Sequence, residues 1–297
     1  MRLDLPADFA LRDQIMKCLA QLADQSGGIV TREQLTDLEV GGGRRRIVDR
    51  NAGIWNPKDL NATLSIMSSP TGPYRDGQVE GGFFKYDYRA GSVDGSNKKL
   101  RRAVELGLPL ILLFKLKANI FVPVFPVFAV AFDDQARQFL LALDESLRFV
   151  EDPGTMSEPL KRYAEQTTRR RLHQPLFRAS VIRAYQTQCT VCRLKHGELL
   201  DAAHIRPDSD EEGLPVVSNG LSLCKIHHAA YDQNLLGIRP DWVVQINQGL
   251  LTETDGPMLK YGLQEMHGTT ITLPRRKAEH PSLQALEWRY EQFKAAS

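Results

Sequence analysis

The chain has 297 residues, more than one small domain usually holds, so we expect two domains. Hydrophobic residues make up 42% and charged residues 25%, as in an ordinary globular protein, and a net charge of +2 does not by itself indicate a nucleic-acid partner. No apolar run reaches the roughly 18 residues of a membrane span, and the first residues lack the pattern of a secretory signal. We therefore expect no membrane partner and a cytoplasmic location.

Residues 1–39 are expected to be helical. Apolar residues recur at helical spacing between positions 8 and 22. Thr31 is then placed as an N-cap, with Gln34 three residues later, which is the spacing of a capping box. The three glycines at 41–43 are expected to end this helical part.

Residues 44–150 have the pattern of a β-rich domain with one helix. Short apolar or alternating runs are separated by Gly, Pro, Asp and Asn, which predicts strands over 54–64, 82–88, 108–113, 121–130 and 138–143. A helix is predicted over 95–106, with Asn97 as its cap.

Residues 151–183 are predicted to form a basic helical connector. Between positions 155 and 183 there are seven Lys and Arg residues against two acidic ones. Such a cluster can follow a phosphate backbone, but it is equally typical of a solvated helical face. An amphipathic helix is expected over 282–296. The predicted organisation is therefore a domain at 1–150, the connector at 151–183 and a second domain at 184–297.

Three of the four cysteines lie in one segment, which favours a metal site over disulfides in a cytosolic protein. Cys189 and Cys192 are separated by two residues, as are Cys224 and His227. Two such pairs can converge on one tetrahedral Zn²⁺ ion. Four protein ligands leave no open position, so this zinc would be structural. A zinc finger that only binds DNA would use the same ligands.

The segment between the two pairs carries a second set of polar residues. His204 ends a predicted strand that Pro207 stops, Asn219 lies in a loop, and His228 follows His227 on a short predicted helix. Hydrolysis of a phosphodiester needs an activated water and a cation. His204 can take a proton from water at neutral pH, and His228 can hold a divalent ion, Mg²⁺ or Mn²⁺. Asn219 is suited to hold the loop or to orient His204.

These motifs resemble the HNH endonuclease family, whose fold is a ββα-metal module. The resemblance rests on AAHIRP at 202–207, NGLSLC at 219–224 and HHAAYD at 227–232. It implies that His204, Asn219 and His228 are the signature residues of a nuclease. Many members carry an acidic metal ligand directly before the first histidine, whereas this chain has Ala203. Asp201 is expected on the opposite strand face, in a structural role.

Most of residues 40–145 resemble, in pattern and domain order, the SRA/PUA-like domain of McrA-like modification-dependent restriction endonucleases. The resemblance implies a β-rich barrel that flips a modified cytosine, such as 5-methylcytosine or 5-hydroxymethylcytosine, out of the duplex. Aromatic rings would stack on this base, Asp and Asn would bind its edge, and Arg would hold a phosphate. The candidate residues are Trp55, Tyr74, Asp76, Tyr86, Asp87, Tyr88, Arg89 and Asn97.

The expected fold class is therefore α+β: N-terminal helices and an SRA/PUA-like barrel, the connector, and a zinc-containing HNH domain. The leading hypothesis is a restriction endonuclease that cuts double-stranded DNA near a modified cytosine. One alternative is an HNH endonuclease without modification dependence. The other is a non-catalytic zinc-containing DNA-binding regulator, which has no need of the His204, Asn219 and His228 set. A homodimer would suit double-strand cleavage, although no residue requires one.

Overall fold

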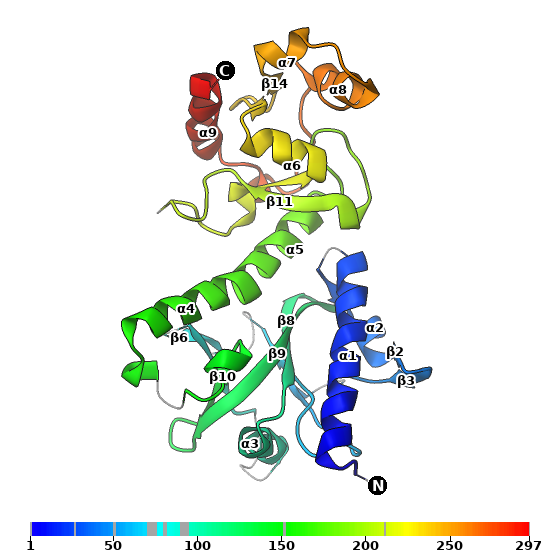
Figure 1. Cartoon of the computed structure of the whole chain (residues 1–297), viewed down its shortest axis with the longest axis vertical. Coiled ribbons are helices and arrows are strands. Elements are labelled where there is room, and N and C mark those ends of the chain that lie inside the picture. The colour runs from blue at the N-terminus through cyan, green and yellow to red at the C-terminus, as the bar shows by residue number, and fades with distance from the viewer. Residues whose placement is uncertain are drawn as a thin grey trace. The chain divides into compact units, whose positions relative to one another are not determined.

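The computed structural model describes all residues except 1, 27, 50–51, 70–75, 80–81, 90–94, 151–152, 211 and 297. They form two compact units, Met1–Pro175 and Leu176–Ser297 (Figure 1). The buried hydrophobic residues form separate cores in the two units. The fold class is α+β, as predicted. Within the described residues, no helix is long and apolar enough to cross a membrane.

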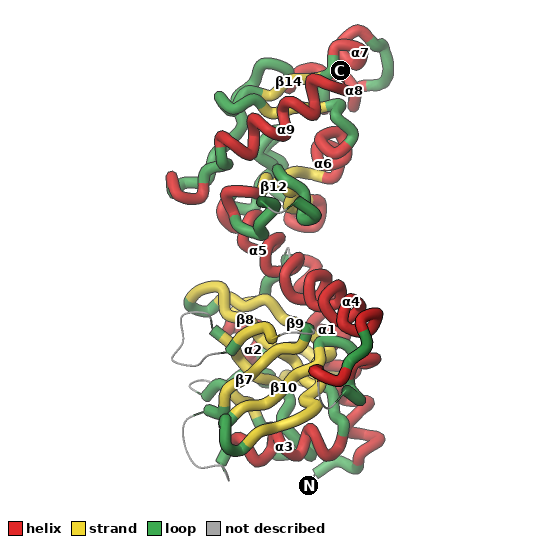
Figure 2. The backbone as a smooth tube through the Cα atoms, turned by 90° about the vertical axis from the view of Figure 1, so that its left-hand side faces the viewer, coloured by secondary structure: helices red, strands yellow, loops and turns green. Residues whose placement is uncertain are grey.

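The first unit is built on a sheet whose strands are drawn in yellow in Figure 2. In the described part of the chain the strand order is β4-β5-β8-β9-β10-β7-β6, and β1 also pairs with β9. All of these pairs are antiparallel except β5 with β8. The strands are β1 (Val30–Thr31), β4 (Ile54–Trp55), β5 (Ser65–Ser68), β6 (Gly77–Val79), β7 (Phe83–Asp87), β8 (Leu110–Lys117), β9 (Ile120–Asp133) and β10 (Gln138–Ala142).

The long strand β9 curls this sheet into a half-barrel. Its first half pairs with β1 and β8, and its second half pairs with β10. The β8 and β10 ladders both change register along it, and an extra residue in a ladder bends the strand and increases its twist. One strand therefore belongs to both halves of the sheet.

Four predicted strands and the predicted helix are confirmed, as β7 to β10 and as α3 (Ser96–Leu106). The capping role of Asn97 was wrong. The N-cap of α3 is Gly95, and the buried Asn97 amide instead bonds the backbone N–H and carbonyl of Arg89, at 3.1 Å each. Asn97 therefore ties the start of α3 to the end of β7.

The predicted strand over 54–64 was also wrong beyond Trp55. Pro57 has no N–H to give to a ladder, and the polar groups that follow bond to helix α1 (Leu5–Gln25) instead. The carbonyls of Ala62 and Thr63 accept from Arg12 at 3.0 and 2.7 Å, and the backbone N–H of Asn61 donates to Asp8 at 2.7 Å.

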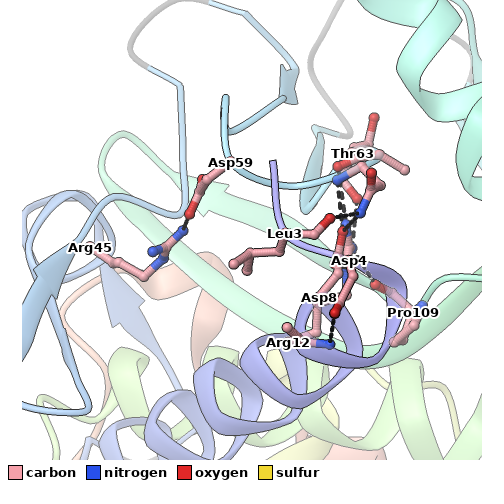
Figure 3. A network of polar contacts seen from close by, with 11 residues as sticks. Leu3, Asp4, Asp8, Arg12, Arg45, Asp59, Thr63 and Pro109 are labelled. Carbon is pink, nitrogen blue, oxygen red and sulfur yellow. Dashed lines mark hydrogen bonds and ion pairs between the residues drawn. The ribbon is translucent and has the colours of Figure 1, made fainter. Parts of the chain in front are cut away.

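Figure 3 shows the ion pair at the centre of these contacts, between Arg12 and Asp8 at 2.5 Å. Both side chains are fully buried, and Arg12 also donates to the carbonyl of Pro109 at 2.7 Å. Breaking a buried pair by removing one partner typically costs about 3–5 kcal/mol. The pair thus fixes α1 against the segment before β5 and the start of β8.

The expectation that residues 1–39 are helical holds for α1 and for α2 (Arg32–Thr36). The predicted capping box of Thr31 and Gln34 is present. The three glycines do not end a helical part, however. Strands β2 (Leu38–Val40) and β3 (Gly43–Arg45) form a hairpin, in which Gly41 and Gly42 take positive φ angles of 59° and 79° at the turn.

The segment predicted as a connector is helical and is divided between the two units. It contains α4 (Glu158–Thr168), a π-helical turn (Arg169–His173) and α5 (Gln174–Ala184). Ala164 on α4 packs with Phe83 and Phe128 of the sheet, whereas Phe177 and Val181 on α5 belong to the core of the second unit. Part of the positive charge is paired, since Arg171 bonds to Asp144 at 3.2 Å and Arg178 to Asp201 at 3.2 Å.

The second unit consists of two small hairpins and several helices around one core. The predicted C-terminal helix is confirmed as α9, with Leu286 and Phe293 buried, although Leu283 is exposed. The elements after α5 are β11 (Leu200–His204), β12 (Gly220–Cys224), α6 (Lys225–Asp232), β13 (Leu236–Ile238), β14 (Val244–Ile246), α7 (Gln248–Thr252), α8 (Pro257–Gly262) and α9 (Leu283–Ala296).

Candidate active site and metal centre

The two predicted ligand pairs come together in the second unit. The ligand atoms of Cys189, Cys192, Cys224 and His227 all lie within 4.8 Å of one another. The first pair lies on a turn closed by bonds between Cys189 and residues 193 and 194, and the second on the junction of β12 and α6. We call these four residues the Cys3His cluster. Three thiol groups and one imidazole are the four ligands that a tetrahedral Zn²⁺ ion takes in structural sites.

Hydrogen bonds within and beside the cluster affect the protonation and orientation of its ligands. Hydrogen bonds among the three thiols lower the pKa of Cys224, whose thiolate is the form that binds metal, and raise the pKa of Cys189. His227 Nε2 donates to the carbonyl of Gly262 in α8 at 2.7 Å. This leaves Nδ1 as the nitrogen that faces the sulfurs, 3.5 Å from Cys189 Sγ and 3.2 Å from Cys224 Sγ.

The hairpin β11–β12 and helix α6 carry the remaining motif residues. Strand β11 and helix α6 are labelled in Figure 1. His204 ends β11, opposite Gly220 at the start of β12. His227 and His228 are neighbours on α6, about 100° apart around the helix. His227 accordingly points into the Cys3His cluster, while His228 lines a separate cavity together with His204.

His204 is held by stacking. Its ring lies 3.9 Å from that of Phe177 on α5, at an interplanar angle of 16°. Its Nε2 is buried and has no hydrogen-bond partner within the described residues. Burial lowers the pKa of His204 below its ordinary 6.5, the nearby His228 lowers it further, and Asp208 opposes both. At neutral pH the imidazole is therefore neutral and can accept a proton.

Asn219 holds the loop that follows His204. Its side-chain oxygen accepts from the backbone N–H of Arg206 at 2.9 Å, and its amide donates to the carbonyls of Arg206 and Leu214 at 3.0 and 3.1 Å. Its own carbonyl accepts from Ile205 at 2.9 Å. These contacts fix the chain directly after His204 without touching the imidazole.

His228 lies between two carboxylates. Its Nδ1 is 3.7 Å from Asp201 and its Nε2 is 3.4 Å from Asp232, one turn further along α6. Asp201 also pairs with Arg178 at 3.2 Å and with Lys225. Hydrogen bonds from these two cations hold the pKa of Asp201 below its ordinary value against the opposing effect of burial. Asp201 is thus a charged, firmly held partner for one side of the His228 ring.

The cavity shared by the two histidines has a volume of about 570 Å³. Asp208, Asp232 and the α9 residues Trp288 and Arg289 also line it. Sequence reasoning did not assign these four residues to the site. The four-residue spacing of His228 and Asp232 could have suggested a shared helix face, but nothing local indicates that α9 forms a wall here.

The candidate base-binding residues of the first unit lie in a buried network. Arg89 pairs with Asp76 at 2.6 Å, and its Nε donates to the hydroxyl of Tyr86 at 2.8 Å. The Tyr86 hydroxyl donates in turn to the carbonyl of Gly53 at 2.8 Å. Asn97 joins this network through the backbone of Arg89. Because Tyr86 is fully buried, neither face of its ring is open to a base in this conformation.

The other candidates are also engaged. The Tyr88 ring lies against that of Phe139 at a tilt of 35°, with ring centroids 4.5 Å apart, and its hydroxyl donates to Asp134 at 2.8 Å. Asp87 accepts from Gln138 at 3.1 Å. Trp55 is half-buried and donates from its indole N–H to the carbonyl of Arg46 at 2.9 Å. Tyr74 lies outside the described residues. Trp55 is therefore the described aromatic candidate that is not buried.

Comparison with known protein families gives a match for the part of the second unit that contains the sequence motifs. A family model described as HNH endonuclease matches residues 189–239, which hold the Cys3His cluster, β11, β12 and α6. This part of the chain is therefore similar in sequence to HNH endonuclease domains. The match ends before α9, so the wall formed by Trp288 and Arg289 lies outside it.

Comparison with solved structures gives several matches, of which three are described, each with a low TM-score. A modification-dependent TagI restriction endonuclease is 17% identical over 89% of this chain and 90% of its own, with a TM-score of 0.31. An SRA domain of SUVH5 in complex with hemimethylated CG DNA is 20% identical over 31% and 72%, with a TM-score of 0.26. The type IV phosphorothioation-dependent restriction endonuclease ScoMcrA is 14% identical over 73% and 56%, with a TM-score of 0.24. TM-scores this low establish no common fold. No curated protein matches the chain.

Proposed function

We propose that the protein is a DNA endonuclease that hydrolyses phosphodiester bonds in the cavity between β11 and α6. The observation that carries this proposal is the placement of His204 and His228 on one cavity within an HNH endonuclease domain. His204 is the general base, because its neutral imidazole can take a proton from the attacking water. Asn219 is a positioning residue that fixes the chain beside His204.

His228 is the proposed holder of a divalent ion, Mg²⁺ or Mn²⁺. Its Nδ1 faces the charged Asp201, so that Nε2 is the nitrogen presented toward Asp232 and the cavity. When bound, such an ion supplies positive charge against the leaving oxygen of the phosphodiester. The Cys3His cluster is the proposed structural Zn²⁺ site, in which four protein ligands leave no position for substrate.

The test of the nuclease is the variant His204→Ala with Mg²⁺ or Mn²⁺ present. We expect cleavage of plasmid DNA to fall by about 10²-fold or more, because general-base catalysis contributes about this much. Zinc content should stay as in the parent chain. The matched control is His196→Ala, since His196 is an exposed histidine of the same unit outside the cavity. Undiminished cleavage by His204→Ala would refute the assignment.

We further propose that the first unit selects DNA that carries a modified cytosine. The support is the pattern of residues 40–145 and their position before an HNH domain. Among the described aromatic candidates, Trp55 is half-buried, whereas Tyr86 and Tyr88 are buried, so Trp55 is the proposed stacking residue. The buried Arg89, Asp76 and Tyr86 are better suited to hold the ends of β6 and β7 in place than to contact DNA.

Matched duplexes containing cytosine, 5-methylcytosine or 5-hydroxymethylcytosine test this selection. We expect cleavage of at least one modified duplex and much slower cleavage of the unmodified one. Equal cleavage of all three duplexes would refute modification dependence and support a nuclease that cuts DNA regardless of modification. Binding without cleavage under either metal would favour a zinc-containing regulator instead.

A further inference from the structure

Helix α4 and the π-helical turn after it carry positive charge on a surface of the first unit that the proposed nuclease site does not use. One side of this segment is buried, at positions that have the spacing of a single helix face: Ala164, Thr167, Thr168 and Leu172. On the opposite side, Arg162, Arg169 and Arg170 are exposed. We call these three residues the arginine face.

The buried side holds this segment in one orientation beside the sheet of the first unit (Figure 2). The Thr168 hydroxyl donates to the carbonyl of Gly82 and lies 3.0 Å from that of Ala164. Gly82 has a φ of 76°, and a Cβ there would come within 2.3 Å of the Ala164 backbone carbon. Helix α4 thus lies directly against the chain that leads into β7, and the arginine face points away from this contact.

The arginine face keeps its positive charge, whereas the neighbouring cations are paired. Two ion pairs neutralise the other basic residues of α4 and the π-helical turn, Lys161 with Glu158 at 3.5 Å and Arg171 with Asp144 at 3.2 Å. Within the described residues, neither Arg162 nor Arg170 forms an ion pair. Glu165 is the one acidic residue between positions 159 and 175. The face therefore has an excess of two positive charges.

The residue type and the spacing of the arginine face fit a phosphate backbone. A guanidinium group binds a phosphate through two parallel hydrogen bonds, which a lysine cannot form. Arg162 and Arg169 are seven residues apart, or about 10 Å along the helix, which is about the axial rise of three phosphates on one DNA strand. DNA is also the polyanion on which the proposed nuclease acts, so it is the partner that the charge favours.

We propose that the arginine face binds the phosphate backbone of duplex DNA without regard to base sequence. The proposal rests on the DNA endonuclease function proposed above. Contacts to phosphates fix the position of a protein on the duplex but carry no sequence information. The face therefore adds affinity and orientation, while selection of a modified base is left to other residues of the first unit.

The salt dependence of DNA binding tests this proposal. The full zinc-loaded chain is titrated into a fluorescent duplex without divalent ions, so that no cleavage occurs, and anisotropy is followed between about 50 and 200 mM KCl. The test variant combines Arg162→Gln, Arg169→Gln and Arg170→Gln. We expect it to bind about tenfold more weakly at low salt, and the slope of log affinity against log salt to fall by about one for each arginine.

Two further triple variants serve as controls. Replacement of the same three arginines by Lys keeps the charge and should keep the slope within about one of the parent value. The matched control removes three exposed charges from α3 and from the end of β8, by Lys98→Gln, Arg102→Gln and Lys117→Gln. It should change the slope by less than about one. Unfolding midpoints should be unchanged throughout, because the replaced side chains are exposed. Arg162→Gln alone, with an expected loss of about one in slope, gives the same test with a smaller change.

Duplexes with cytosine and with 5-methylcytosine are compared, and the glutamine variant should lose affinity for both by the same factor. A parent-like slope of this variant would overturn the proposal, as would an equal loss in the matched control or a loss confined to the modified duplex. Plasmid cleavage with Mg²⁺ is scored separately. If the variant loses affinity but the parent cuts no DNA, the nuclease proposal fails and the phosphate contact stands.

Discussion

At the scale of single residues, burial sets the charge state in which His204 can act. The stacked Phe177 ring covers one face of the imidazole, and removal from water disfavours the protonated form. A general base is active when it is unprotonated, so a lowered pKa extends its activity to lower pH. His204 therefore needs no carboxylate partner to be neutral at pH 7, in agreement with the absence of a partner for its Nε2 among the described residues.

This leads to a pH prediction. At a fixed, saturating metal concentration, kcat/KM should rise with pH and level off, with a midpoint below the ordinary histidine value of 6.5. The sign follows because the active form predominates above the lowered pKa. Replacing Phe177→Leu should move the midpoint upward, since it exposes the imidazole, while His196→Ala should leave it in place. A parent midpoint above 6.5 would contradict the proposed effect of burial.

At the scale of elements, the geometry of α6 directs its side chains to two separate places, the Cys3His cluster and the cavity. Cys224 caps the helix, His227 faces the sulfurs, and His228 and Asp232 face the cavity. Because His228 and Asp232 are four residues apart, their side chains lie on the same face of α6. The sequence contains the local part of this arrangement, since the Cys and His spacings predict which side chains converge.

What the sequence could not indicate depends on contacts between distant segments. The wall that Trp288 adds to the cavity requires α9 to return to α6 across some fifty residues of chain. Similarly, long strands such as β9 have enough alternating residues to be predicted, whereas β1 has two residues and no recognisable pattern. Asn97 was predicted as a cap because a polar residue at the start of a helix usually caps it. Its actual partner is the backbone of Arg89, which comes close to Asn97 only once the sheet has folded.

At the scale of the whole molecule, the two units have separate cores, and the Cys3His cluster belongs to the second. Its ligands come from the turn at Cys189 and from the β12–α6 junction, so a bound ion closes the loop that carries His204 and Asn219. Structural zinc contributes about 10–16 kcal/mol in small zinc modules, as much as the whole stability of a typical domain, about 5–15 kcal/mol. Loss of this ion should therefore unfold the second unit.

A strong zinc chelator should consequently affect the units unequally. We expect amide hydrogen exchange to accelerate in β11, β12 and α6, while β8, β9 and β10 keep their protection, because their core contains no ligand of the cluster. Cleavage should stop, and binding of DNA by the first unit should persist. The control is Cys18→Ser, which alters a thiol outside the cluster and should leave the response to chelator unchanged. Equal loss of protection in both units would show that their stabilities are coupled despite separate cores, whereas no change in the second unit would show that the cluster does not depend on a metal.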